Sequence, residues 1–159
     1  MDISFLNLQP IKPVDASEHI PKDRGVYCWF SNDENRLLYV GRALGAKGLF
    51  HRIVNQHLNP NYLEFRAEKQ TSKDQFQLKF AIKKVINGKV QFGIDKSAFR
   101  KSIGRKLKIK PGADTVDFIK SNLYVKLIIS SDVKDIINIE RFLIKEYQPE
   151  FNTSMKKIK

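Results

Sequence analysis

Two short apolar runs lie near the start of the chain, at residues 25–30 and 37–41. Each is about as long as a β-strand, in which successive side chains point to opposite faces. The stretch between them, residues 31–36, is polar. Two such strands joined by a polar connection predict a hairpin.

Strict alternation also sorts the side chains of this hairpin by face. In the first strand it places Val26, Cys28 and Phe30 on one face and Tyr27 and Trp29 on the other. In the second strand it places Leu38 and Val40 on one face and Leu37 and Tyr39 on the other. Tyr27 and Tyr39 can therefore share a face. Two aromatic residues on a hairpin are usually a cross-strand packing pair, and taken alone these two have that simple interpretation.

Two other stretches carry apolar residues at helical spacing, residues 49–58 and about 132–147. Ser131 or Asp132 is the candidate N-cap of the second helix, because short polar side chains accept hydrogen bonds from the first free backbone amides. Pro149 stops this helix, since proline cannot continue it.

A third strand is expected at about residues 122–130. We expect the three strands to form a small, mostly antiparallel sheet flanked by the two helices, which is an α+β fold. A chain of 159 residues, 42% hydrophobic, can bury one real core. We therefore predict a single domain over residues 1–159, with an insertion at about 66–120.

One acidic residue falls within the apolar stripe of the second helix. Glu140 lies three or four positions from Ile136, Leu143 and Ile144. Glutamate is almost never fully buried unless it is paired or binds a metal. Glu140 is therefore a candidate site residue, and a salt bridge with Arg52 at the rim of the core is the structural alternative.

Taken in chain order, these features resemble the GIY-YIG endonuclease family. The family pattern is a GIY-like strand, a YIG-like strand, an arginine on the next helix, a glutamate on a later helix and a P-x-x-N ending. The matching residues are Gly25-Val26-Tyr27, Tyr39-Val40-Gly41, Arg52, Glu140 and Pro149 to Asn152. Each tripeptide alone is a weak signal, but five elements in order are specific.

The resemblance implies a metal-dependent endonuclease that hydrolyses the phosphodiester bonds of DNA. Glu140 would be the only protein carboxylate on one Mg²⁺ or Mn²⁺ ion, with waters and phosphate oxygens as the other ligands. Tyr27, and to a lesser degree Tyr39, would orient or deprotonate the attacking water. Deprotonation requires nearby positive charge, because a free phenol has a pKa of about 10. Arg52 would neutralise charge developing on the phosphate.

Four further residues have supporting roles under this resemblance. Gly41 would let the backbone approach the substrate, Arg42 would contact the adjacent phosphate, and Asn152 would tie the C-terminal segment to the core. His57 follows Arg52 by five residues, whereas many family members have a histidine at plus four. At about 100° per residue of an α-helix, His57 is expected to point away from the side that carries Arg52.

The charge of the chain independently indicates nucleic acid. Lys and Arg number 29 against 17 Asp and Glu, which gives a net charge of +12 and a pI near 9.8. The segment from Arg66 to Lys110 holds fourteen basic and three acidic residues, or +11 of this charge. We predict a separate DNA-binding element there. A solvated lysine-rich face is the alternative for residues 83–89.

Within this basic segment we predict a hairpin followed by a helix. Residues 76–82 alternate, and Asn87-Gly88 is a strong turn signal. Residues 97–107 have apolar side chains four positions apart, so the helix is expected to pack its apolar stripe on the domain and to project basic side chains toward phosphates. The candidate nucleic-acid contacts are Lys96, Arg100, Lys101, Arg105 and Lys106.

Several classes of function are excluded or disfavoured. No uncharged run approaches the eighteen residues of a membrane span, no secretory signal is present, and a single cysteine, Cys28, agrees with a reducing compartment; we expect a cytoplasmic protein. One Cys and three His give no zinc-ligand spacing. The alternatives that stay open are a catalytically inactive nucleic-acid-binding module of the same fold and a basic structural protein. A role in restriction would favour a homodimer, because cutting both strands takes two sites.

Overall fold

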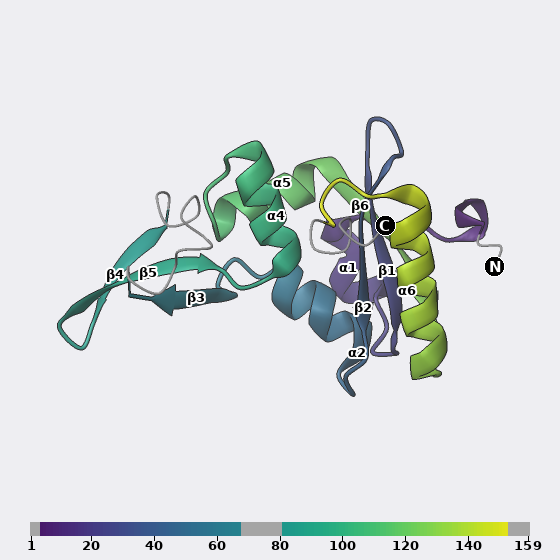
Figure 1. Ribbon diagram of the computed structural model, residues 1–159, viewed down its shortest axis with the longest axis horizontal. Helices are drawn as coiled ribbons and strands as arrows, with labels where there is room; N and C mark the ends of the chain where they lie inside the picture. The colour runs from purple at the N-terminus through teal and green to yellow at the C-terminus, as the bar shows by residue number, and fades with distance from the viewer. Residues whose placement is uncertain (1–3, 68–80, 153–159) are drawn as a thin grey trace.

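The computed structural model describes residues 4–67 and 81–152 (Figure 1). These residues form helices and two antiparallel three-stranded sheets, so the predicted α+β class is confirmed. The strands of the first sheet lie in the order β2-β1-β6, and both pairs are antiparallel. They are β1 (Gly25–Ser31), β2 (Leu37–Ala43) and β6 (Leu123–Ile129), which match the three predicted stretches.

A β-bulge in the hairpin changes the predicted sorting of one strand by face. Trp29 pairs with Tyr39 but Phe30 pairs with Leu37, so Leu38 is the extra residue. Leu37 therefore packs on the same side as Val40, and Leu38 on the opposite side. The prediction that Leu38 shares a face with Val40 is wrong, because an extra residue reverses the alternation on one side of the bulge.

One face of the first sheet is covered by α6 (Val133–Tyr147). Asp132 is its N-cap and accepts hydrogen bonds from the amides of Lys134 and Asp135 at 2.8 and 3.4 Å. This helix ends two residues before Pro149, as predicted. The cluster beneath it is formed by side chains of β1 and β2 and the apolar stripe of α6. Its members are Val26, Cys28, Phe30, Leu37, Val40, Ile136, Leu143 and Ile144.

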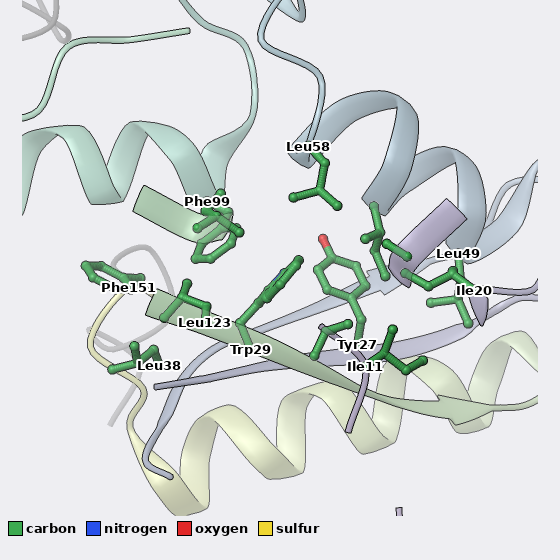
Figure 2. Packing of buried hydrophobic residues seen from close by; sticks show 14 of the residues in the cluster. Ile11, Ile20, Tyr27, Trp29, Leu38, Leu49, Leu58, Phe99, Leu123 and Phe151 are labelled. Carbon is green, nitrogen blue, oxygen red and sulfur yellow. The ribbon is translucent and has the colours of Figure 1, made fainter. Parts of the chain in front are cut away.

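The other face packs against several short elements, and Figure 2 shows the side chains of this larger cluster. Trp29 is fully buried and stacks on Phe99, with ring centroids 5.6 Å apart. Residues far apart in sequence, among them Ile20, Leu49 and Phe151, close the same cluster. The elements near the N-terminus are η1 (Phe5–Asn7), η2 (Pro13–Asp15) and α1 (Ala16–His19).

The predicted helix at residues 49–58 forms, but most of it is not an α-helix. One α-helical turn, α2 (Gly48–Phe50), leads into a π-helix, η3 (His51–His57). The hydrogen bond from the Leu58 amide to the Ile53 carbonyl, 2.9 Å long, joins residues five apart, which is the π-helical pattern. In η3, side chains five positions apart therefore point in more similar directions than they would in an α-helix.

The second sheet has the strand order β3-β5-β4 and lies apart from the first sheet, at the left of Figure 1. Its strands are β3 (Leu63–Arg66), β4 (Ile82–Ile86) and β5 (Lys89–Asp95). The predicted turn between β4 and β5 is confirmed, with φ values of 52° at Asn87 and 75° at Gly88. The predicted strand at residues 76–82 lies almost wholly outside the described residues, and β3 was not predicted.

Two helices follow the second sheet, α4 (Ala98–Leu107) and α5 (Ala113–Asn122). The first confirms the predicted amphipathic helix: Phe99 and Ile103 are buried in the larger cluster, although Leu107 is 41% exposed. No helix in residues 4–67 or 81–152 is long and apolar enough to cross a membrane.

Candidate active site

A pocket of about 230 Å³ lies beside β2, the edge strand of the first sheet, where β1, η3, α6 and the C-terminal segment meet it. The structure brings seven of the residues predicted from the sequence into this pocket. They are Tyr27, Tyr39, Gly41, Arg42, Arg52, Glu140 and Asn152.

The two tyrosines share a face, as predicted, with ring centroids 6.2 Å apart. Tyr27 is 2% exposed, and Figure 2 shows its hydroxyl pointing away from the sheet toward Leu58. Burial, with further contributions from neighbouring groups such as Tyr39, raises the pKa of Tyr27 well above its ordinary value. Burial followed by the Glu140 charge raises the pKa of Tyr39 to about 12. Both phenols are therefore neutral near neutral pH.

Gly41 has a structural reason to be glycine. A Cβ atom at this position would lie 2.3 Å from the hydroxyl oxygen and ring of Tyr27, so any larger residue would displace that side chain. The sequence predicts that Gly41 lets the backbone approach a substrate. In the structure, the space above it is filled by Tyr27.

Glu140 is buried, with 7% of its surface exposed, as its place in the apolar stripe predicts. Its partner is Arg42, whose Nη1 atom lies 3.6 Å from Oε1, and not Arg52. Burial raises the pKa of Glu140, and the charges of Arg42, Arg141 and Arg52 oppose this shift. The pocket therefore contains one buried carboxylate surrounded by cationic groups.

Arg52 is exposed at the pocket, and its Nη1 atom donates to Oε1 of Gln56 at 3.0 Å. Its charge lowers the pKa of Tyr27, but the effect of burial is larger. The positive charge that was expected to help ionise Tyr27 is therefore present, but it does not offset the effect of burial on the pKa of this tyrosine.

His57 lies behind Tyr27, inside the protein. Its Nε2 atom is 2.7 Å from the Tyr27 hydroxyl, and its Nδ1 atom is 2.7 Å from Oγ of Ser97. The expectation that His57 points away from the site is wrong, because it assumed an α-helix where the chain forms the π-helix η3. Burial, then the charges of Arg52 and Arg100, lower the pKa of His57 to about 3. The imidazole is therefore neutral.

Asn152 ties the C-terminal segment to β2, as predicted. Its side-chain oxygen accepts from the Val40 amide and its side-chain nitrogen donates to the Val40 carbonyl, both at 2.8 Å. This pair reproduces the hydrogen bonding of a neighbouring strand and covers part of the sheet edge. Its role at the pocket is to hold β2 in place.

Arg100 differs from the prediction for the basic helix. Its side chain is fully buried and forms an ion pair with Asp95, 2.5 Å between Nη2 and Oδ1. Its Nη1 atom also donates to the carbonyl groups of Gln56 and Asn59 at 2.9 and 2.6 Å. Arg100 therefore cannot contact phosphates; it binds the carbonyls at the end of η3 and fixes this helix to α4.

The other predicted nucleic-acid contacts lie at the surface. Lys96, Arg105 and Lys106 are exposed, and Lys101 is half-buried. Lys106 also donates to the Glu150 carbonyl and lies over the ring of Phe151. The basic helix thus presents fewer exposed charges than its sequence predicts.

Two residues of this network were missed as site residues, Ser97 and Asp95. Ser97 is the N-cap of α4 and contacts His57, and Asp95 accepts from Gly112 and Thr115 in addition to Arg100. In the sequence, Ser97 directly precedes an amphipathic helix and Asp95 ends an apolar strand. These positions indicate an N-cap and a strand end, but they do not reveal that Ser97 contacts the distant His57.

A divalent cation would find one carboxylate here. In the part of the chain that the structure describes, no group of three or more His, Cys, Asp or Glu side chains is placed to hold a metal. Glu140 alone therefore fits Mg²⁺, which binds through one or two carboxylates and keeps several waters, better than a metal that needs a full protein cage.

No protein-family model, curated protein or solved structure matches this chain.

Proposed function

We propose that this protein is a metal-dependent endonuclease that hydrolyses DNA phosphodiester bonds, with a catalytic domain of the GIY-YIG type. The observation that carries the proposal is the pocket itself, where a buried carboxylate, two arginines and a pair of neutral tyrosines face one space. Ionisable groups with shifted pKa values gathered in a cleft are characteristic of active sites. A buried ion pair is weak evidence for a purely stabilising role.

Glu140 would hold the divalent cation through its carboxylate oxygens. An ion bound there would supply Lewis-acid stabilisation of negative charge on the phosphate and the leaving oxygen. Arg42 now neutralises this carboxylate at 3.6 Å, and it is 37% exposed, so it is free to turn toward a phosphate. Its contact with Glu140 and its exposure therefore fit a group that would leave the carboxylate and bind a phosphate instead.

Arg42 and Arg52 would bind the scissile phosphate. A guanidinium group presents donors in a fork that matches two phosphate oxygens, and it stays charged at any accessible pH. Arg52 is exposed at the mouth of the pocket, where substrate would arrive. Both groups would favour the transition state, in which negative charge on the phosphate oxygens increases.

Tyr27 would orient the attacking water through its hydroxyl group. Because burial raises its pKa, ionisation of Tyr27 costs free energy in the unliganded protein. Orientation by a neutral phenol is therefore favoured over direct deprotonation of the water. Tyr39, also at the pocket and with a raised pKa, would assist in the same way.

DNA flanking the cleaved bond would contact the exposed basic residues of the second sheet and α4. Lys83, Lys84 and Lys89 are exposed on the β4–β5 hairpin. Phosphate contacts of this kind give affinity and position without reading sequence.

The proposal is tested by incubating supercoiled plasmid with the protein in Mg²⁺ or in EDTA. We expect cleavage in Mg²⁺ only, and a loss of at least about 100-fold in Glu140→Gln, because the amide keeps the shape but removes the charge that holds the cation. Glu146→Gln is the matched control, since Glu146 is exposed on the same helix. Undiminished cleavage by Glu140→Gln would exclude this site.

One observation favours a second candidate, the inactive nucleic-acid-binding module. The Arg42–Glu140 ion pair satisfies both groups without any metal. In the same experiment this alternative predicts salt-dependent DNA binding with no cleavage by the wild type in either Mg²⁺ or Mn²⁺.

A further inference from the structure

We infer that Ser97, a residue of the basic segment, holds His57 in the tautomer with its proton on Nε2 and thereby directs the Tyr27 hydroxyl hydrogen into the pocket. The hydrogen-bond assignment follows from geometry alone. Its consequence for catalysis rests on the proposed nuclease function.

The three side chains form a continuous buried row. Tyr27, His57 and Ser97 are 2%, 3% and 5% exposed, and both hydrogen bonds that join them are 2.7 Å long. Bulk water does not reach such groups, so each polar hydrogen needs an acceptor within the protein. The direction of each hydrogen bond can therefore be decided by matching donors to acceptors.

A neutral imidazole carries one N–H group and one acceptor nitrogen. In the first arrangement Nδ1 donates to Ser97 and Nε2 accepts from Tyr27. In the second, Ser97 donates to Nδ1 and Nε2 donates to Tyr27. Both arrangements fit the distances, so the surroundings of Ser97 decide between them.

Ser97 already accepts one hydrogen bond as the N-cap of α4, from the Arg100 amide to Oγ at 3.3 Å. In the first arrangement its oxygen would accept twice, and its own hydrogen would have no acceptor among the described residues. In the second arrangement the hydroxyl accepts from Arg100 and donates to His57. A serine hydroxyl has one donor and can accept, so only the second arrangement uses its donor.

The consequence concerns Tyr27. When Nε2–H donates to the Tyr27 oxygen, the phenol hydrogen is not held by the histidine, and Tyr27 can donate it to Tyr39, its side-chain hydrogen-bond partner at the pocket. There the hydrogen can also reach a water or a phosphate oxygen of a bound substrate. With the other tautomer, this hydrogen would be held by Nε2 and would point into the protein. Ser97 is therefore a positioning residue that acts on Tyr27 through His57.

The position of Ser97 is fixed by the neighbouring network. Three residues further along α4, Arg100 binds the carbonyls of Gln56 and Asn59 and the carboxylate of Asp95. These bonds attach the start of α4 to the end of η3, directly beside His57. The basic segment thus contributes to the pocket as well as carrying surface charge.

The test is the ¹⁵N NMR spectrum of the imidazole groups in the full chain, without DNA or metal, with His57 assigned by comparison with His57→Gln. We expect the proton on Nε2 in the wild type and in Ser97→Thr, which keeps the hydroxyl. In Ser97→Asp we expect the proton on Nδ1, because a carboxylate still caps α4 but can only accept. Cleavage by Ser97→Asp should fall by about 10- to 100-fold, as for other residues that orient a functional group, and Ser97→Thr should retain activity.

A proton on Nδ1 in the wild type would overturn the inference, and so would a proton that stays on Nε2 in Ser97→Asp. The wild-type spectrum alone tests the position of the His57 proton, even if a variant does not fold. If the wild type shows the predicted tautomer but never cleaves DNA, the proposed function fails while the hydrogen-bond assignment stands.

Discussion

The two sheets of this protein have the same number of strands and the same antiparallel pairing, but they differ in what surrounds them. All seven residues of β1 in the first sheet are buried, between two separate apolar clusters. In the second sheet, Val85 and Val90 form a cross-strand pair that is 67% and 53% exposed. A sheet enclosed on both faces fixes its side chains, and we interpret the first sheet as the support of the active site.

The second sheet instead displays charge and aromatic rings. Its lysines lie over neighbouring rings, at 5.9 Å for Lys83 over Phe92 and 5.6 Å for Lys84 over Phe65. A lysine held this way keeps its ammonium group near the surface while its stem covers apolar area. Under the proposed function, we expect this difference to correspond to a division of roles, with cleavage at the first sheet and DNA contact at the second.

The largest expected effect concerns the residue that joins the two regions. Arg100→Leu removes the ion pair with the buried Asp95 and the hydrogen bonds to the end of η3. We expect a loss of about 3–5 kcal/mol in the free energy of unfolding, measured by urea denaturation. Lys145→Leu, at an exposed position of α6, should change stability by less than about 0.5 kcal/mol. Equal effects would mean that α4 is not fixed through Arg100.

A pair of valine substitutions tests the contrast in burial directly. Val26→Ala in β1 removes two methyl groups from a fully buried site and should cost about 2 kcal/mol. Val85→Ala in β4 makes the same chemical change at an exposed site and should cost less than about 0.5 kcal/mol. Similar losses in urea denaturation would show that the second sheet is as enclosed as the first.

Substitution of the hairpin lysines is expected to have the smallest effect on stability. It should still change DNA binding clearly. Replacing Lys83, Lys84 and Lys89 by glutamine should leave stability unchanged and weaken DNA binding. The slope of log affinity against log salt should decrease by about 0.9 for each phosphate that the variant no longer neutralises. Fluorescence anisotropy at several salt concentrations measures this slope.

The matched control removes three exposed lysines from the region of the first sheet, Lys22, Lys134 and Lys145. Both variants lower the net charge equally. If they change the salt slope by the same amount, DNA is attracted by total charge and the second sheet has no special role.

Much of the first sheet and its helices could be predicted from the sequence, because the pattern is local. Two short apolar runs separated by a polar stretch indicate β1 and β2, and Asp132 with Pro149 delimits α6. The pocket residues could be predicted because the motif elements occur in the order of the family they resemble and because Glu140 lies in an apolar helix stripe. The bulge at Leu38 could not be read, since one extra residue leaves the local composition unchanged.

The remaining differences arise from contacts between distant segments. Arg100 has the sequence context of a surface residue, and only the fold places Asp95, Gln56 and Asn59 around its guanidinium group. His57 was misplaced because the choice between α- and π-helix depends on backbone hydrogen bonds that tertiary packing selects. β3 was missed because four residues are too short a pattern to predict a strand, even beside the turn signal Asn59-Pro60-Asn61.

The most direct test of the central claim measures binding and single-turnover cleavage side by side on one DNA substrate. We predict that Glu140→Gln binds DNA like the wild type and does not cleave it. The triple lysine variant should bind more weakly yet cleave at the wild-type rate once protein is saturating. Loss of binding in Glu140→Gln, or a reduced cleavage rate at saturation in the lysine variant, would contradict the division between a sheet that supports catalysis and a sheet that contacts DNA.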